Sequence, residues 1–228
     1  MQFFNFSSFV EYLGNSFLIQ GALITLALTV TSALGGMALG MCLAAMKMAK
    51  SKPLSLFASF YLWIFRGTPL LVQLVVVFTG LPQLGIKLGV VESTLLALIM
   101  NEAAYMAEII RSGFMGVPSG QREAAESLGL PLWLVVSKIT LPQAFRLMIP
   151  PLGNSVNSLL KSTSLASVIS MEELMRRSQV LMQQEYQVLE VFGAAAVFYL
   201  IMTTAWGFVQ RALEKHFGAS HALERQDG

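Results

Sequence analysis

Five long apolar runs constrain the fold more than any other feature of this sequence. A helix that crosses a membrane needs about 20 apolar residues, because each residue advances it by about 1.5 Å through hydrocarbon about 30 Å thick. We predict membrane spans over residues 16–46, 54–81, 90–110, 145–169 and 188–210. The runs are continuous rather than alternating, and they are too long for barrel strands. We therefore expect an all-α, polytopic membrane helix bundle.

The composition agrees with a membrane protein. Of the 228 residues, 55% are hydrophobic and 12% are charged, whereas soluble domains have about 45–50% and about 25%. Cys42, the single cysteine, lies within the first apolar run, so we interpret it as a small apolar filler. That run follows no basic segment and precedes no small-residue cleavage site, so we expect no cleavable signal peptide. We interpret residues 1–228 as one transmembrane domain.

Lysine and arginine collect in alternate connections between the spans. The second and fourth connections carry three of them, whereas the first connection, the third and the C-terminal segment carry ten. Basic residues favour the cytoplasmic side. We therefore expect the N-terminus outside and the C-terminus in the cytoplasm. The ten residues are Lys47, Lys50, Lys52, Arg111, Arg122, Lys138, Arg146, Arg211, Lys215 and Arg225.

The residues needed for membrane-embedded chemistry are missing from the spans. Both histidines, His216 and His221, and the single aspartate, Asp227, lie in the C-terminal tail. This placement excludes a metal site, a histidine-containing triad and an aspartyl dyad within the membrane. No G-x-x-x-x-G-K-[ST] phosphate-binding loop occurs. We expect no catalytic residue, no metal and no cofactor in this chain, and any ATP would be bound elsewhere.

The connection over residues 118–142 has its own helix signals. Ser119, which follows Pro118, is placed to cap a short helix. Glu123 is expected in the first turn, where the helix dipole favours an acid. Gly129 suits the left-handed residue that ends such a helix. The first part of this connection therefore predicts a helix on the order of 15 Å long.

A second helix is expected after the turn. Pro131 can open it, because a proline at the first helical position loses no hydrogen bond. The Leu141–Pro142 pair predicts the next break. We expect the first helix to expose four residues, which would form a small apolar knob beside one acid: Glu123, Ala124, Ala125 and Leu128.

The pattern of this connection resembles the EAA loop of ABC importer membrane subunits. It reads Glu123-Ala124-Ala125, three residues, Gly129, nine residues, and then Ile139-x-Leu141-Pro142. Three further segments resemble the polar amino acid permease branch of that family: FRGTPLLVQL over 65–74, AYMAEIIRSG over 104–113 and KSTSLASVIS over 161–170. Ser162 stands where the family has Asp or Asn, and Ala103 where it often has Gly, so the individual substrate stays open.

The resemblance implies a type I ABC importer fold with a cytoplasmic helix-turn-helix coupling loop over residues 118–142. It implies a dimer of ATPase subunits that binds ATP and Mg²⁺, with Glu123 pairing with a basic residue in an ATPase groove. It also implies a second permease subunit, identical or homologous, and an extracytoplasmic amino-acid-binding protein. The alternative for the loop is a simple connector between two spans.

Polar side chains at membrane depth predict a substrate path, because charges there are costly and usually functional. Gly67-Thr68-Pro69 predicts a kinked or unwound point whose backbone could face a cavity. An amino acid needs donors for its carboxylate and acceptors for its ammonium group. We assign the path to Arg66, Thr68, Asn101, Glu102, Glu108, Lys161, Thr163 and Ser164.

Structural alternatives stand beside these assignments. Arg66 and Glu108 could form a buried pair that holds two spans together. Lys161 could anchor to a neighbouring carbonyl, and the hydroxyls of Thr163 and Ser164 could bond back to their own helix. Each alternative would remove the residue from the ligand path.

These observations favour one function. We expect the membrane-spanning subunit of an ATP-driven ABC importer, which moves polar amino acids across the bacterial cytoplasmic (inner) membrane by alternating access. We expect it to contact the lipid bilayer and no nucleic acid. The alternative is a passive channel or pore subunit without an ATPase, which would function without Glu123.

Overall fold

The computed structural model describes residues 4–218, and within them the chain is helical, with no strand. The predicted all-α bundle is confirmed. The α-helices are α1 (Phe6–Leu13), α2 (Ser16–Met48), α3 (Lys52–Gly67), α4 (Leu70–Val75), α5 (Val90–Met115), α6 (Ser119–Ser127), α7 (Leu132–Leu134), α8 (Leu141–Ser162), α9 (Leu174–Glu185) and α10 (Val188–Gly218). Short π and 3-10 segments join them: η1 (Val76–Gly80), η2 (Leu81–Leu84), η3 (Val135–Thr140) and η4 (Thr163–Ile169).

Within residues 4–218, four helical segments are long and apolar enough to cross a membrane: Ser16–Met48, Val90–Met115, Leu132–Ile169 and Val188–Phe217. The second predicted span is a broken one, because α3 and the segment Leu70–Leu84 meet at 103°. The break falls at the predicted place. Pro69 disfavours a helical conformation at the residue before it, and Thr68 is accordingly extended, at φ −116° and ψ 146°.

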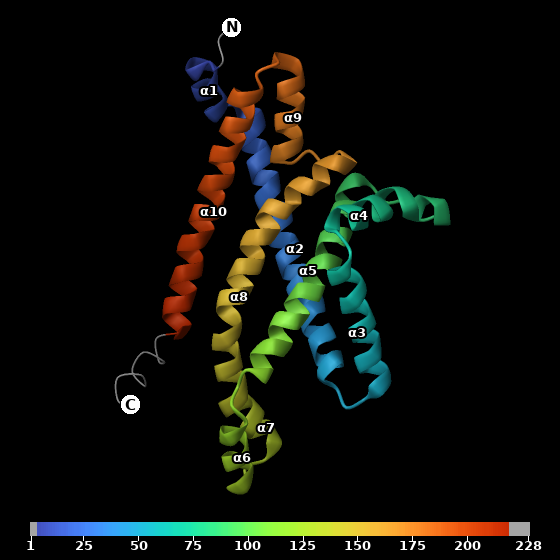
Figure 1. Cartoon of the computed structure of the whole chain (residues 1–228), viewed down its shortest axis with the longest axis vertical. Coiled ribbons are helices and arrows are strands. Elements are labelled where there is room, and N and C mark those ends of the chain that lie inside the picture. Colours follow the sequence, from blue (N-terminus) through green and yellow to red (C-terminus); the bar gives the residue numbers. More distant parts are fainter. Residues whose placement is uncertain (1–3, 219–228) are drawn as a thin grey trace.

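Helices α2, α5, α8 and α10 run along the long axis of the molecule, and the shorter α3 packs against α2 and α5 (Figure 1). The N-terminal helix α1 and helix α9 lie at one end, and the α6–α7 segment lies at the other. Within the bundle, α2 and α5 pack closely. A Cβ atom on Gly36 would lie 2.9 Å from the Glu102 side chain, and one on Gly40 would lie 2.7 Å from Met106. Glycine at these positions therefore allows the close approach.

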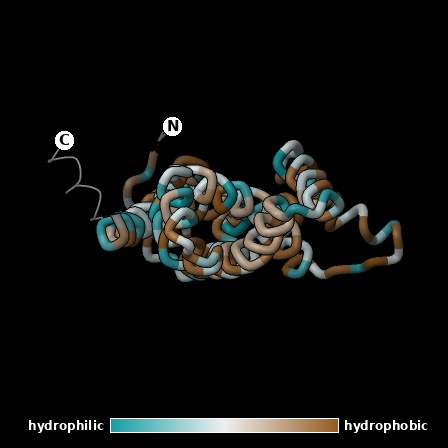
Figure 2. The backbone as a smooth tube through the Cα atoms, turned by 90° about the horizontal axis from the view of Figure 1, so that it is seen from below, coloured by the Kyte–Doolittle hydropathy of each residue, from teal (hydrophilic) through white to brown (hydrophobic). Residues whose placement is uncertain are grey.

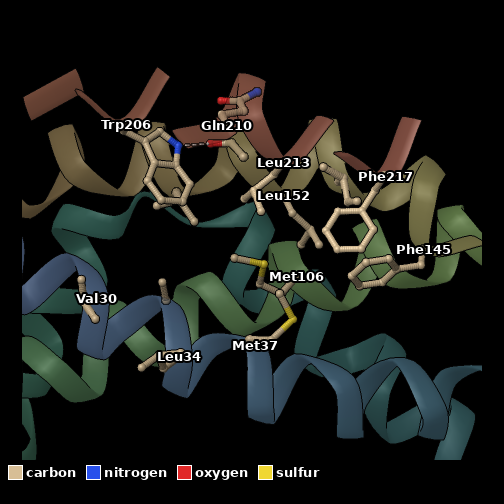
Figure 3. Close-up of a pocket in the computed structure, with 14 residues that line it drawn as sticks. Val30, Leu34, Met37, Met106, Phe145, Leu152, Trp206, Gln210, Leu213 and Phe217 are labelled. Atoms are coloured by element: carbon tan, nitrogen blue, oxygen red, sulfur yellow. Dashed lines mark hydrogen bonds between the residues drawn. The ribbon is translucent and has the colours of Figure 1, made fainter. Parts of the chain in front are cut away.

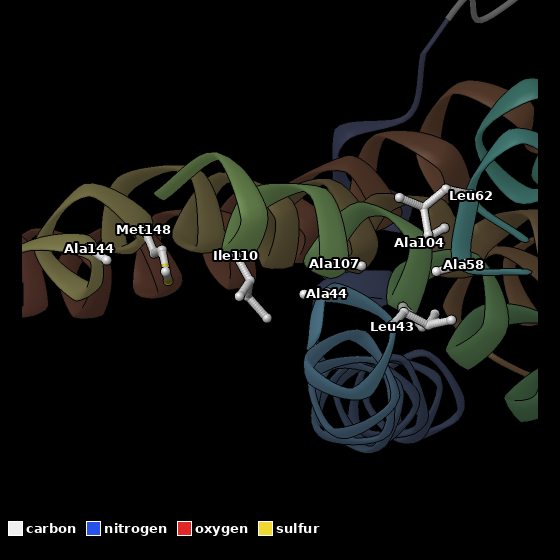
Figure 4. Close-up of a cluster of buried hydrophobic side chains, with 10 residues drawn as sticks. Leu43, Ala44, Ala58, Leu62, Ala104, Ala107, Ile110, Ala144 and Met148 are labelled. Carbon is white, nitrogen blue, oxygen red and sulfur yellow. The ribbon is translucent and has the colours of Figure 1, made fainter. Parts of the chain in front are cut away.

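The largest buried cluster joins α2, α3, α5 and α8, and most of its members are small (Figure 4). Alanines let the helix backbones approach, while a few larger side chains fill the remaining space. The cluster consists of Leu43, Ala44, Ala58, Leu62, Ala103, Ala104, Ala107, Ile110, Ala144 and Met148.

The outer surface is also apolar. Hydrophobic positions, brown in Figure 2, occur along the outer turns of the bundle as well as inside it. Large apolar side chains are more than half exposed on α2, α3 and α10, for example Leu34 at 68%, Trp63 at 71% and Phe208 at 64%. A surface of this kind suits the hydrocarbon of a bilayer.

Candidate functional site

The α6–α7 segment forms a helical hairpin at one end of the molecule (Figure 1). Gly129 has φ +78°, the left-handed conformation that was predicted for it. The Leu130 amide donates to the Ala125 carbonyl at 3.2 Å, and the Gly129 amide donates to the Glu126 carbonyl at 3.0 Å. This pair of hydrogen bonds is the Schellman motif, which satisfies the last carbonyls of a helix. The turn is therefore fixed by the backbone of the chain itself.

The start of the hairpin differs from the prediction. Helix α6 begins at Ser119 with Pro118 at the N-cap, and no side chain caps it. Pro118 already has the extended conformation of an N-cap, at φ −57° and ψ 131°. Ser119 is helical, so its hydroxyl does not act as the cap. Glu123 is consequently the fifth residue of α6, and the first turn contains no acid.

The exposed face of α6 is smaller than predicted. Glu123 and Ala124 are exposed, and Leu128 is 81% exposed. Ala125, however, is only 4% exposed, because α6 folds back and packs against η3. The prediction that Ala125 belongs to the outer face is wrong. Glu123, Ala124 and Leu128 form the surface that another protein could contact, and we call it the hairpin face.

The predicted break at Leu141–Pro142 is absent. Residues Leu132–Ile169 run as one helical segment of 38 residues. In the π-helical η3 the hydrogen bonds span five residues, so the Leu141 amide donates to the Val136 carbonyl. This wider turn accommodates the ring of Pro142, which lies in the first turn of α8. Ile139 is half-buried in η3, and Leu141 is 44% exposed.

One polar contact that was not predicted joins the hairpin helix α6 to α8. The Gln143 side-chain amide donates to Gln121 Oε1 at 2.6 Å and to the Ile139 carbonyl at 2.9 Å. It ties the start of α8 to α6. The sequence signal is weak, since Gln143 is simply the residue that follows the Leu141–Pro142 pair.

A polar cavity of about 500 Å³ lies where α3 breaks, between α4, α5 and α8. It brings together three of the predicted path residues, Thr68, Asn101 and Glu102. The other lining residues are Pro69, Leu70, Tyr105, Ile109, Pro151, Asn154, Ser155, Ser158, Leu159 and Ser162. Ser162, which sequence analysis linked to the substrate, is one of the polar lining residues on α8. Asn154, Ser155 and Ser158 were not predicted, although all four residues recur at helical spacing on one face.

The side-chain amides of Gln73 and Asn101 donate hydrogen bonds at the C-terminal end of α3, where the helix breaks. Gln73 donates to the Phe65 carbonyl at 3.0 Å and to Thr68 Oγ1 at 2.9 Å. Asn101 donates to the same Phe65 carbonyl at 3.1 Å and to Gln73 Oε1 at 3.0 Å. Carbonyls released where a helix stops need such partners. Asn101 therefore helps to hold the break open, and Gln73, which was not predicted, does so as well.

Glu102 supplies the carboxylate of the cavity. Its side chain is 5% exposed, and Oε1 accepts a hydrogen bond from Ser155 Oγ at 2.6 Å. The bond links α5 to α8. A carboxylate in such a place can accept hydrogen bonds from an ammonium group.

Arg66 and Glu108 lie outside the polar cavity. Arg66 Nη1 is 3.7 Å from Glu108 Oε2, and Arg111 Nε donates to that same oxygen at 3.0 Å. The ion pair of the structural alternative is therefore present, but it is not buried, because the Arg66 side chain is 42% exposed. The closer partner of Glu108 is Arg111. Arg66 also lies 5.8 Å from the centre of the Tyr105 ring.

Lys161, Thr163 and Ser164 also lie outside the polar cavity. Lys161 and Ser164 line a separate hollow against α10. Thr163 is fully buried and donates to the Leu160 carbonyl at 2.7 Å, and Ser164 donates to the Lys161 carbonyl at 2.6 Å. Both hydroxyls bond back to their own helix, as the structural alternative requires. Among residues 4–218 no cluster of potential metal ligands occurs.

A family model described as binding-protein-dependent transport system inner membrane component matches residues 36–218. The chain is 38% identical over 200 residues to a putative glutamine transport system permease protein of Rickettsia conorii, which covers 87% of this chain and 92% of that protein. It is 36% identical to the arginine transport system permease protein of Bacillus subtilis, over 87% of this chain and 91% of that protein.

Solved structures share the fold. A chain from the crystal structure of an amino acid ABC transporter with histidines matches with a TM-score of 0.87 and 36% identity, over 93% of this chain and 98% of that one. A chain of an inward-facing methionine ABC transporter matches with a TM-score of 0.72 at 20% identity, over 88% of this chain and 95% of that one. The second likeness concerns the fold alone.

Proposed function

Because this chain belongs to the family of binding-protein-dependent transport system inner membrane components, we propose that its polar cavity is the route of a polar amino acid. The chain is a multi-pass protein of the inner membrane and the membrane-spanning subunit of an ABC importer. The observation that carries the substrate proposal is the polar cavity at the break of α3, where a buried carboxylate lies beside hydroxyl and amide groups.

The cavity has the chemistry that an amino acid requires. Glu102 can accept hydrogen bonds from the ammonium group, and the hydroxyls of Ser158 and Ser162 and the amide of Asn154 can donate to the carboxylate. A volume of about 500 Å³ lies within the range of about 300–1,000 Å³ found for small-molecule sites. The relatives, a putative glutamine transport permease and an arginine transport permease, support the same class.

The proposed orientation puts the N-terminus outside and the hairpin in the cytoplasm. Arg122, Lys138 and Arg146 lie in or next to the hairpin, and basic residues favour the cytoplasmic side. The N-terminal helix lies at the opposite end (Figure 1). A reporter fused after Gln121 is expected to report a cytoplasmic position, and an external position would reject this orientation.

The partners follow from the family. We propose a dimer of ATPase subunits that binds ATP and Mg²⁺ below, a second permease subunit beside this chain, and an amino-acid-binding protein above. The hairpin face (Glu123, Ala124 and Leu128) would dock in an ATPase groove, with Glu123 opposite a basic residue. An acid between small and apolar side chains suits such a contact, because the apolar part buries area and the charge fixes the register.

The unbroken helix suggests how the two sites communicate. Segments α7, η3 and α8 form one continuous helical segment, and α8 supplies Asn154, Ser155, Ser158 and Ser162 to the cavity. A displacement of the hairpin by the ATPase would therefore move one wall of the cavity. In alternating access, nucleotide binding would draw the hairpins together and open the cavity to the outside.

The test is transport by the reconstituted complex. Polar amino acids, supplied with the binding protein, are expected to stimulate ATP hydrolysis and to accumulate in vesicles only when ATP is present. A response to sugars or metal ions alone would reject the substrate class. Ligand flux without ATP would favour the passive channel instead.

A further inference from the structure

An apolar groove of about 410 Å³ runs between α2, α5, α8 and α10 (Figure 3). It lies on the face of α8 opposite the polar cavity: Ile149, Leu152 and Val156 line the groove, whereas Pro151, Ser155 and Ser158 line the cavity. A partner subunit that completes the polar route would therefore lie on the other side of α8. The groove faces the surroundings of the bundle.

The polar atoms of the groove are paired within the protein. Trp206 Nε1 donates to the Gly153 carbonyl at 2.8 Å, as the dashed line in Figure 3 marks. The Gln210 side chain donates to Asn154 Oδ1 at 3.2 Å and to Glu214 Oε1 at 2.9 Å. Apolar cavities of this kind do not hold water. The groove is therefore suited to a hydrocarbon occupant.

The length of the groove matches one leaflet of a bilayer. On α8 the lining residues extend from Phe145 to Val156, and on α10 from Trp206 to Phe217. Eleven residue steps of a helix correspond to about 17 Å, and half of a hydrocarbon core about 30 Å thick is about 15 Å. Trp206 lies at one end of the groove, and the Phe145–Phe217 ring pair, with centroids 5.2 Å apart, lies at the other (Figure 3).

The end flanked by Phe145 and Phe217 carries positive charge. Arg146 follows Phe145, and Lys215 and His216 precede Phe217. Arg146 and Lys215 are exposed, and neither has a carboxylate within ion-pair distance among residues 4–218. Glu214, which precedes Lys215 in the sequence, is hydrogen-bonded to Gln210. Exposed basic residues at this depth attract anionic lipid headgroups.

We propose that this groove binds one acyl chain of an anionic phospholipid from the leaflet on the hairpin side, with its headgroup held by Arg146. The length of the groove, its apolar lining and its basic end all fit an acyl chain with an anionic headgroup. The site is distinct from the substrate route, because it lies across α8 from the polar cavity.

Trp206 offers an intrinsic probe, because the sequence has three tryptophans and the other two, Trp63 and Trp133, are exposed. Both are replaced by Phe, and the full chain is placed in nanodiscs that contain phosphatidylglycerol or phosphatidylcholine with brominated acyl chains. Bromine quenches tryptophan fluorescence at contact. We expect brominated phosphatidylglycerol to quench Trp206 at a mole fraction severalfold lower than brominated phosphatidylcholine.

Two variants and a control complete the test. Arg146→Gln is expected to weaken the preference for the anionic lipid about fivefold. One basic residue near an anionic membrane surface strengthens binding by about that factor. Ala33→Phe is expected to fill the groove and remove the added quenching, whereas Ile201→Phe, on an exposed part of α10 away from the groove, is expected to leave it.

Three results would overturn the proposal. Equal quenching by both lipids that survives Ala33→Phe would show ordinary collisions with surrounding lipid. Lipid preference unaffected by Arg146→Gln would reject the headgroup site. Absence of quenching by either lipid would show that protein, such as a second copy of the chain, covers the groove.

Discussion

The hairpin and the polar cavity are the two candidate sites of this chain, and they are built in opposite ways. The hairpin is contiguous in sequence, lies outside the bundle and is shaped by its own backbone hydrogen bonds at Gly129. The cavity is assembled from α3, α4, α5 and α8, and its carboxylate is buried. Local rules therefore govern the first site, and tertiary packing governs the second. Substitutions should separate them, so that one site fails while the other remains intact.

The largest expected effect is a charge reversal on the hairpin face. Glu123→Lys is expected to weaken association with the ATPase about a hundredfold, which corresponds to about 2.7 kcal/mol. The reason is that Glu123 is exposed and would meet a basic groove. The measurement is co-purification of the ATPase with the permease. Glu185→Lys makes the same change at an exposed residue on α9, at the other end of the molecule, and should retain the ATPase.

A variant of the cavity should show the opposite behaviour. Glu102→Gln keeps an acceptor for Ser155 but removes the charge, and hydrogen bonds to charged groups contribute about 1.5–3 kcal/mol. The KM for uptake is expected to rise on the order of 10- to 100-fold, while the ATPase still co-purifies. Glu108→Gln, outside the cavity, serves as the comparison. A larger rise in KM for Glu108→Gln would mean that the ligand passes the Arg66 side instead.

Two neighbouring alanines distinguish docking from folding of the hairpin. Ala125→Trp overfills the contact between α6 and η3 and is expected to destabilise the hairpin by about 1–3 kcal/mol. Ala124→Trp changes an exposed residue, so it should block docking and leave the hairpin folded. Hydrogen exchange of the α6 amides measures the difference. Equal protection in both variants would contradict the inward position of Ala125.

The smallest effect is expected at the contact between the hairpin helix α6 and α8. Gln143→Leu removes the hydrogen bonds to Gln121 and the Ile139 carbonyl, at a cost of about 1 kcal/mol. We expect the ATPase to remain bound and transport per ATP hydrolysed to fall modestly, because the hairpin then moves partly on its own. Unchanged coupling would show that the helical connection through η3 suffices.

The residues explain how far sequence reasoning reached. The turn at Gly129 and the break at Thr68–Pro69 were predicted because each depends on local backbone preference. Ala125 was placed on the wrong face, since its burial depends on how α6 folds against η3. The break expected at Leu141–Pro142 did not occur, because a π-helical turn absorbs the proline. Asn154, Ser155 and Ser158 of α8 were missed because small polar side chains on a helix do not reveal from the sequence whether another helix faces them.

Only some of the residues predicted for the substrate path line the polar cavity, because the position of each side chain also depends on how the helices pack. Thr68, Asn101 and Glu102 meet in one cavity, but Arg66 and Glu108 pair beside it, and Lys161 and Ser164 face α10. The position of a polar residue within a membrane span indicates that its burial is costly, but it does not indicate in which direction the side chain points. The ligand roles of these residues stay predictions until transport is measured.

Helix α8 contains two adjacent prolines, Pro150 and Pro151, between the hairpin and the polar cavity residues Asn154, Ser155, Ser158 and Ser162. Each proline withholds one amide, so the carbonyls of Arg146 and Leu147 lose their usual helical partners. Two consecutive backbone hydrogen bonds of the helix are thus missing, so α8 bends more easily there than along the rest of its length. A force applied at the hairpin would bend this joint before it shifts Ser155. The Trp206 hydrogen bond to the Gly153 carbonyl, just beyond the joint, ties α8 to α10 there, so α10 would limit how far α8 can bend.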